Sequence, residues 1–235
     1  MESAEIGKIF FDDGYRLADE HIRPGLSKDT MFRAIRVLYE SIDGLLISLC
    51  HRSALEGMPV ECERGCSWCC HQAVFAVSHE FVYVWEHAIY NLDERLLQRI
   101  RQATDNKYSS TKGRSEKELL RLKLPCPFLD KGACTVYTHR PMACRIYLST
   151  SIASCREEFQ DPQDEQNIPA LLEFPLQAGR MMNEGFVARL REAGLKCGER
   201  PLEWGLSEVQ NAAPDYIHKW LSGGDLFSKC ERQVV

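Results

Sequence analysis

The chain has 235 residues, which is long enough to bury a hydrophobic core as one large domain or two small ones. Its formal net charge of −5 gives no overall attraction to nucleic acid or to an anionic membrane. No uninterrupted apolar run approaches bilayer length, and Glu2 places an acid where a signal peptide would be basic. We therefore expect a single soluble domain over residues 1–235, in the cytoplasm, with neither a membrane nor a nucleic acid as its partner.

The first long element that the sequence predicts is a helix over about residues 29–56. Ser27 supplies a helix-capping side chain, and apolar residues from Ile35 to Leu49 recur on one helical face. Cys50 lies on the same apolar side, so we interpret it as a small buried hydrophobe rather than a ligand. Residues 1–26 mix charged and apolar side chains without a clean period, and no element is predicted there.

A dense run of thiols follows this helix. Cys62, Cys66, Cys69 and Cys70 fall within nine residues of a chain that has eleven cysteines in all. An odd number of clustered thiols in a reducing compartment is a poor basis for a disulfide framework. Thiolates held this close repel one another unless a cation neutralises them. The run therefore predicts a metal site.

A second amphipathic helix is predicted over about residues 79–104, packed antiparallel against the first. Residues 105–115 are polar and predict a loop, followed by a short helix near residues 115–122. Residues 94–123 carry an excess of basic side chains, which we interpret as solvated rather than as a binding surface for nucleic acid.

A second group of cysteines lies in a turn-rich stretch and consists of Cys126, Cys134 and Cys144. Residues 130–132, Asp-Lys-Gly, separate two short apolar segments and predict a β-hairpin. Such a hairpin would hold Cys126 near its entry and Cys134 on its return strand, where both thiolates face one cation. Cys155 follows closely enough to return as an eighth ligand. We expect the two groups to meet around one or two metal centres.

Three other side chains near these cysteines are candidates for supporting roles. Arg140 and Arg145 flank Cys144 and could offset the charge of a thiolate-rich centre or donate hydrogen bonds to sulfur or to the backbone. His71 follows Cys70 directly, and we keep it as a reserve ligand or a residue behind the ligands.

The rest of the chain predicts loops and helices. Acidic residues between positions 157 and 165 indicate a solvated loop, and Pro169 opens a helical region to about Ala193. Pro175 and Gly179 could kink or split that helix. The last forty residues predict short helices that wrap the domain.

The two cysteine blocks carry a resemblance to a known family. The run Cys-x3-Cys-x2-Cys-Cys, then Cys-Pro-Phe-Leu, Gly-x-Cys-x-Val-Tyr and Arg-Pro-x-x-Cys-Arg, resembles the cysteine-cluster family of zinc- or iron-chelating proteins (YkgJ-like). For most members the resemblance implies a metal site and little more. One branch is similar to flagellin lysine methylases, which carry the module in a longer chain, and this slightly favours an iron–sulfur cluster over zinc. Nothing in the sequence resembles a cofactor-binding loop for methyl transfer.

The ligand set that we expect is formed by the thiols of both blocks: Cys62, Cys66, Cys69, Cys70, Cys126, Cys134, Cys144 and Cys155. Their spacing does not decide between zinc and an iron–sulfur cluster, because both use sets of four thiolates. Three functions stay open: a metal-binding module with a possible protein partner, a redox or cluster-transfer protein, and a protein-modifying enzyme. We favour the first, since no nucleophile and base pair is evident and no catalytic residue can be assigned.

Together these features predict a mainly α fold, with a helical frame around a loop-rich cysteine module that contains a short β-hairpin. The module spans about residues 60–156, and the flanking helices span residues 27–57 and 169–222.

Overall fold

A computed structural model describes residues 3–63 and 65–227 of the chain. Within them the fold is mainly α-helical, with small β elements, as the sequence predicted. The α-helices are α1 (Ser3–Ile22), α2 (Lys28–Leu55), α3 (Ser78–Asn91), α4 (Glu94–Thr111), α5 (Glu116–Arg121), α6 (Met142–Arg145), α7 (Ile152–Gln160), α8 (Glu173–Glu192), α9 (Leu202–Gln210) and α10 (Tyr216–Leu221). The shorter elements are η1 (Trp68–His71), η2 (Tyr137–His139), β1 (Phe75–Val77), β2 (Leu129–Asp130), β3 (Ala133–Cys134) and β4 (Glu199–Pro201).

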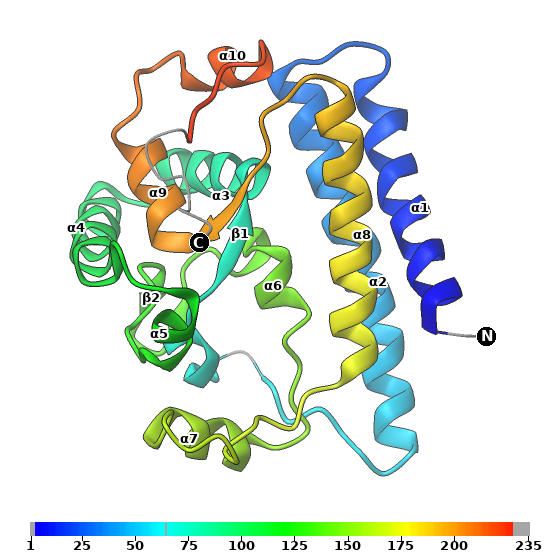
Figure 1. Cartoon of the computed structure of the whole chain (residues 1–235), viewed down its shortest axis with the longest axis vertical. Helices are drawn as coiled ribbons and strands as arrows, with labels where there is room; N and C mark the ends of the chain where they lie inside the picture. Colours follow the sequence, from blue (N-terminus) through cyan, green and yellow to red (C-terminus); the bar gives the residue numbers. More distant parts are fainter. Residues whose placement is uncertain (1–2, 64, 228–235) are drawn as a thin grey trace.

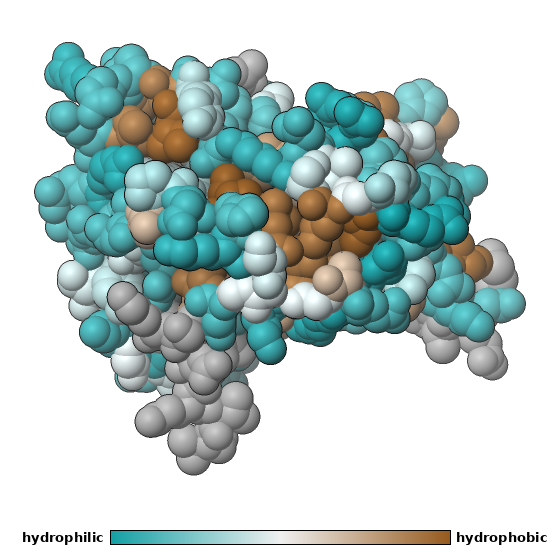
Figure 2. Space-filling model, turned by 90° about the horizontal axis from the view of Figure 1, so that it is seen from above, coloured by the Kyte–Doolittle hydropathy of each residue, from teal (hydrophilic) through white to brown (hydrophobic). Residues whose placement is uncertain are grey.

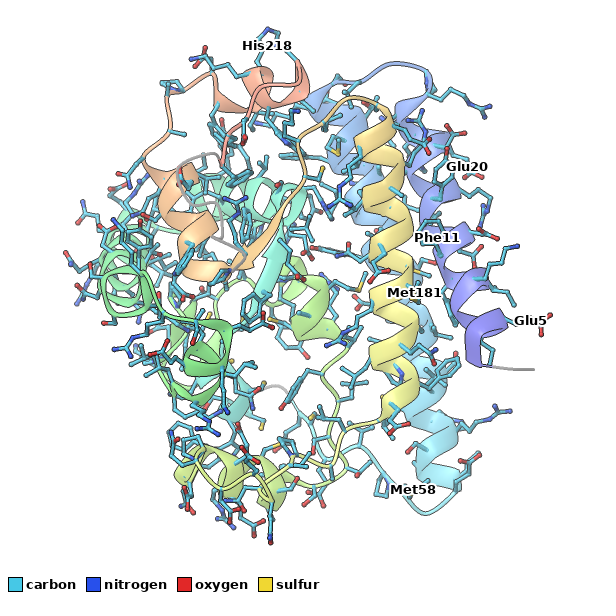
Figure 3. All side chains as sticks on the ribbon, in the orientation of Figure 1. Glu5, Phe11, Glu20, Met58, Met181 and His218 are labelled. Carbon is cyan, nitrogen blue, oxygen red and sulfur yellow. The ribbon has the colours of Figure 1, made fainter. Side chains whose placement is uncertain are left out.

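Three long helices, α1, α2 and α8, lie side by side along one edge of the molecule (Figure 1). The α1 and α8 backbones approach each other at two glycines. A Cβ atom at Gly14 would lie 1.8 Å from the carbonyl oxygen of Met182, and one at Gly185 would lie 1.9 Å from that of Phe11. Phe11 and Met181 mark this contact between the two helices in Figure 3. Only glycine allows so close an approach.

Helix α1 was missed in the sequence because glycines occupy part of its buried face. Gly7 and Gly14 are buried together with Leu17, Ala18 and Ile22. A search for hydrophobic periodicity registers the two glycines as gaps, although the packing depends on their small size. The result is a well-packed helix with no clean apolar period.

Helix α2 confirms the first predicted helix and its start. Ser27 accepts a hydrogen bond from the backbone N–H of Thr30, and its own N–H donates to the Thr30 hydroxyl, which makes a capping box. In addition to its contacts with α3, α2 packs extensively against α1. The predicted antiparallel frame of two helices is therefore replaced by the layer of α1, α2 and α8.

The prediction of one helix over residues 79–104 was wrong. The chain turns at Leu92, whose ψ of 150° is extended, and α4 begins after Asp93. The Asp93 carboxylate accepts a hydrogen bond of 2.9 Å from the N–H of Leu96, as an N-cap does. Apolar residues continue in phase across this break, so periodicity alone does not reveal it.

The predicted loop over residues 105–115 is also largely helical, because α4 continues to Thr111. Its buried face in this part consists of Thr104, Lys107 and Thr111, which a hydrophobic pattern does not count. The short helix near residues 115–122 is confirmed as α5, capped by Ser115.

Two corrections apply to the second half of the chain. Glu157 and Glu158 belong to α7 rather than to a solvated loop, and Glu158 forms an ion pair with the buried Lys123. Helix α8 begins at Glu173 and runs unbroken, since Pro175 stands in its first turn, where a missing N–H costs little. The predicted short helices near the end are confirmed as α9 and α10.

The β elements lie around the cysteine module. Strands β2 and β3 form the predicted hairpin, and Lys131 and Gly132 at its tip have positive φ values of 49° and 79°, as a tight two-residue turn requires. Strand β1 pairs with β4, so the chain that leaves the first cysteine block is joined to the C-terminal region. That residues 1–235 form one domain stays a prediction.

None of the helices in the described ranges combines the length and the apolar character that crossing a bilayer would need.

The contact between α1 and α8 provides the first test. Gly14→Ala or Gly185→Ala should lower the free energy of unfolding by at least about 1–3 kcal/mol, because each added methyl group overlaps a backbone carbonyl. Gly44→Ala is the matched control, since Gly44 is exposed on α2 with open space around it. It should stabilise the helix by about 0.5–1 kcal/mol. Urea denaturation measures all three, and equal effects would mean that α1 and α8 do not pack this closely.

Candidate metal centre

The first cysteine block is folded as a series of tight turns. Cys66 donates its N–H to the carbonyl of Glu63, and Cys70 donates to that of Ser67, both at 3.0 Å. Gly65 has a φ of 105°, a conformation that suits glycine. Cys69 and Cys70 thus lie in η1, with their thiols hydrogen-bonded to each other.

The second block is joined to the first through the backbone. The N–H of Cys126 donates to the carbonyl oxygen of Cys70 at 2.7 Å, although α3, α4 and α5 separate the two residues in the chain. Leu129 then donates its N–H to the carbonyl of Cys126 and pairs with Cys134 across the hairpin. One backbone contact and one hairpin therefore bring Cys70, Cys126 and Cys134 to the same region.

Backbone N–H groups point at both hairpin thiols. The sulfur of Cys126 accepts a hydrogen bond from the N–H of Phe128, and that of Cys134 accepts one from the N–H of Val136. Burial raises the pKa of Cys126 to about 11, and these N–H groups act in the opposite direction. Such donors stabilise thiolate and are a common feature around ligating sulfur.

Cys144 enters the same group from α6. Burial raises the pKa of this thiol well above its usual value, and Cys126, Cys69 and Cys134 raise it further as they ionise. These four thiols are therefore close enough to repel one another as thiolates, which is the situation that a bound cation relieves.

The remaining thiols gather around α7. Cys62 accepts a hydrogen bond of 3.1 Å from the N–H of Ser149. Cys155, buried on α7, interacts with the hydroxyl of Ser149 as well. Burial raises the pKa of Cys62 to about 11, and ionisation of Cys69, Cys155 and Cys66 raises it further. Each of the eight predicted ligands thus lies within electrostatic reach of another.

Cys69 interacts with thiols of both sets, since its charge acts on Cys62, Cys134 and Cys144. The thiol of Cys70 donates a hydrogen bond to Cys69, and this bond, with help from the positive charge of Arg140, lowers the pKa of Cys69 to about 7. The pKa of Cys70 moves in the opposite direction, because loss of its proton would break the same bond.

Two arginines beside Cys144 have different roles. Arg140 lowers the pKa of Cys69, Cys134 and Cys144, as expected for a cation that offsets thiolate charge. Its guanidinium group stacks on the ring of Tyr137 at 3.9 Å and donates to that residue's carbonyl.

Of the roles predicted for Arg145, the structure bears out hydrogen bonds to the backbone near Cys144. The side chain is fully buried, with its guanidinium group 3.9 Å from the ring of Tyr39. It forms an ion pair of 2.5 Å with Asp43 and donates to the carbonyls of Thr138 and Arg140. Arg145 therefore fastens the Cys144 segment to α2.

Sequence reasoning missed two buried charges at this site. Lys107, 8% exposed, donates to the carbonyl of Leu124 at 3.1 Å and lowers the pKa of Cys126. Its position on the same face of α4 as Ile100 and Thr104 was the available signal.

Glu80 is the second buried charge. Its carboxylate accepts hydrogen bonds from the N–H of Val77, the hydroxyl of Tyr39 and the N–H of Met142, at 2.9, 3.1 and 2.6 Å. Because Met142 begins the helix that carries Cys144, this one carboxylate joins that helix to α2 and α3.

The other candidates have structural contacts. His71 makes a hydrogen bond with the carbonyl of Ser67 and packs against Phe159. Cys50 is only half-buried, which is less than expected. Burial raises the pKa of its thiol. Cys197 is also half-buried, with no disulfide bond in the described chain. Cys230 lies outside the described residues.

The types of donor atom fit a metal held by thiolates, although the side chains do not surround a common point. In residues 3–63 and 65–227, no three Cys, His, Asp or Glu side chains are placed to hold a metal ion as they stand. Ligation would require the thiols to rotate about their Cα–Cβ bonds, for which they have staggered alternatives. The soft sulfur donors, the N–H groups at Cys126 and Cys134, and the nearby Arg140 all suit zinc or an iron–sulfur cluster.

Glu80 provides a test of how the site is supported. In Glu80→Gln one carboxylate oxygen becomes an NH₂ group, which faces a backbone N–H with no acceptor between them. We expect the free energy of unfolding to fall by about 1–3 kcal/mol, as for a buried polar group left unpaired. Glu40→Gln on α2 is the control, because the Glu40 side chain is 68% exposed. Chemical denaturation of both variants checks this, and an unchanged Glu80→Gln would remove Glu80 from the support of the site.

Comparison with known proteins agrees with the geometry. Residues 61–167 match the family model CxxCxxCC, described as "Putative zinc- or iron-chelating domain", and this range contains all eight predicted ligands. No curated protein and no solved structure matches the chain. Residues 61–167 of this chain are therefore similar to the CxxCxxCC family, the cysteine-cluster family that the thiol pattern resembles.

Proposed function

We propose that the chain is a metal-binding protein whose cysteine module holds an iron–sulfur cluster or zinc, with the cluster slightly favoured. The proposed ligands are Cys62, Cys66, Cys69, Cys70, Cys126, Cys134, Cys144 and Cys155. The observation that carries the proposal is the 2.7 Å hydrogen bond between Cys126 and Cys70, which unites two thiol blocks that are distant in the chain. A group of buried thiols with mutually raised pKa values gains stability when a cation takes up their charge.

The residues around the thiols would support such a group. Arg140 and Lys107 supply positive charge, while Phe128 and Val136 supply N–H donors to sulfur. When bound, zinc would supply a structural crosslink, and a cluster would add the capacity to carry an electron.

Two hollows on the described surface are formed without the thiols. One hollow is lined by Lys28 and Glu86 together with residues of α10, and another is lined by Phe32, Arg36 and Tyr83. Neither is lined by a cysteine. Seen from the end where α10 lies, hydrophobic side chains gather in the middle of the face within hydrophilic surroundings (Figure 2).

The identity of the metal can be measured on protein purified without oxygen. Visible absorption with iron and acid-labile sulfide would identify a cluster, whereas a colourless protein with stoichiometric zinc would identify zinc. Elemental analysis per chain gives the decisive number. Protein that contains neither metal, even after reconstitution with iron and sulfide or with zinc, would refute the proposed function.

Replacement of single cysteines tests the ligand set. Cys144→Ser should reduce bound metal and lower the melting temperature, because a neutral hydroxyl is a poor substitute for thiolate. Structural zinc stabilises small domains by about 10 kcal/mol or more, and the helical frame here should reduce the loss to a fraction of that. Cys50→Ser should retain its metal, at a cost below the 1–3 kcal/mol of a buried polar group, since Cys50 is half-buried.

The two variants are compared by their metal content and by their melting temperatures with and without a chelator. Full metal in Cys144→Ser would remove that residue from the ligand set. Loss of metal in Cys50→Ser would show that the ligands have been misassigned.

A further inference from the structure

Two histidine rings are stacked face to face where η2 meets α3. The ring centroids of His87 on α3 and His139 in η2 are 3.6 Å apart, and the ring planes differ by only 11°. The ring of Tyr83, one turn before His87 on α3, lies 5.0 Å from the ring of His139. Both imidazoles are half-buried. The two stacked rings are called the histidine pair below.

Hydrogen bonds indicate that His87 is neutral. The side-chain NH₂ group of Asn91 donates to the carbonyl oxygen of His87 at 3.0 Å, which identifies the nitrogen of this amide. The same nitrogen lies 3.3 Å from Nδ1 of His87, so that ring atom accepts a hydrogen bond and carries no proton. Protonation of Nδ1 would turn this hydrogen bond into a contact between two donors.

The charges around the histidine pair also oppose protonation. Arg145, paired with Asp43, acts on His139, and Arg36 and Glu40 on α2 act on Tyr83. No carboxylate in the described ranges accepts a hydrogen bond from either ring. Burial lowers the pKa of both rings, and the charges of a protonated His87 and of Arg145 help to lower that of His139 to about 4. Two protonated rings at this spacing would repel each other strongly.

The histidine pair joins α3 to the middle of the second cysteine block. His139 lies midway in the chain between β3, which carries Cys134, and α6, which carries Cys144. The N–H of His139 donates to the carbonyl of Val136 at 2.8 Å, and Arg140 donates to the carbonyl of Tyr137, so this segment is one compact turn. Release of His139 from α3 would therefore move the backbone that connects the hairpin to α6.

We propose that the histidine pair is an acid-sensitive switch that holds η2 against α3 at neutral pH and releases it when a ring takes up a proton. Both rings are neutral in the closed form, whereas a released ring binds a proton at its ordinary pKa of about 6.5. The free energy that keeps the switch closed is therefore fully present above about pH 6.5, and it is lost as the pH falls toward 4. The inference stands apart from the proposed function, because no thiol takes part in the switch.

Hydrogen exchange of the full chain, as purified, measures the switch directly. Mass spectrometry of a peptide that contains residues 135–141 reports the protection of η2 once the intrinsic pH dependence of exchange has been removed. Between pH 7 and pH 5 the opening of η2 should increase about 20-fold from His139 alone, given pKa values of about 4 when closed and about 6.5 when open.

Replacement of the rings separates the histidine pair from other effects of acid. His139→Phe keeps a ring on His87 but cannot take up a proton, so it should lose most of the acid-dependent opening. The double variant His87→Phe/His139→Phe should lose all of it. His51→Phe is the matched control, since His51 is exposed on α2, and it should open as the wild type does. Circular dichroism of each variant reports whether the helices remain folded.

The wild-type chain provides a second measurement that does not depend on the folding of any variant. NMR titration of the histidine side chains should show two rings with pKa values below about 6.5 whose titration coincides with the loss of η2 protection. Rings of His87 and His139 that titrate at the ordinary pKa would overturn the switch. Protection of η2 that stays constant between pH 7 and pH 5, or equal acid-dependent opening in a folded double variant and in the wild type, would overturn it as well.

Discussion

The carboxylate of Glu80 is the interaction on which the arrangement of the cysteine module depends. It is 1% exposed and joins three elements, through Tyr39 on α2, Val77 before α3 and Met142 at the start of α6. Burial raises its pKa, while the three hydrogen bonds and the nearby Arg145 act in the opposite direction. An acid in this position is stable only because each partner is held in place by a helix or a strand.

Glu80 and Arg145 together explain how the thiols are positioned by residues that are not ligands. Glu80 fixes the first residue of α6, and Arg145 fixes its last through Asp43. Cys144 lies between these two anchors. The helical frame therefore fixes the backbone on both sides of Cys144 through residues that are not predicted ligands.

The sequence predicted those parts of the fold in which chemistry and pattern coincide. The capped helix α2, the Asp-Lys-Gly hairpin and the clustering of thiols each depend on local residues with one evident role. Two missed stretches, α1 and the last part of α4, have buried positions that are not hydrophobic. Gly7 and Gly14 interrupt the hydrophobic pattern on the buried face of α1, and Lys107 interrupts the pattern on the buried face of α4. The ligand assignment itself stays a prediction from the thiol pattern.

The partners of individual charges could not be deduced from the sequence, because they are distant in the chain. Arg145 follows Cys144 directly, so its neighbours in sequence suggested contact with sulfur or with the nearby backbone. Its true partner, Asp43, lies on α2, and only the packing of the helices brings the two together. The partners of Glu80 could not be deduced for the same reason, since Tyr39 and Met142 are far from it in sequence.

The backbone contact between Cys70 and Cys126 has a consequence for synthesis of the chain on the ribosome. The thiols of the first block emerge before α3, α4 and α5, and their neighbours in the second block emerge only after these helices. Until Cys134 has left the ribosome, Cys69 and Cys70 have no hairpin beside them. The module can be completed only late in translation, so its first four thiols pass through a period in which they are open to oxidants and to foreign metal ions.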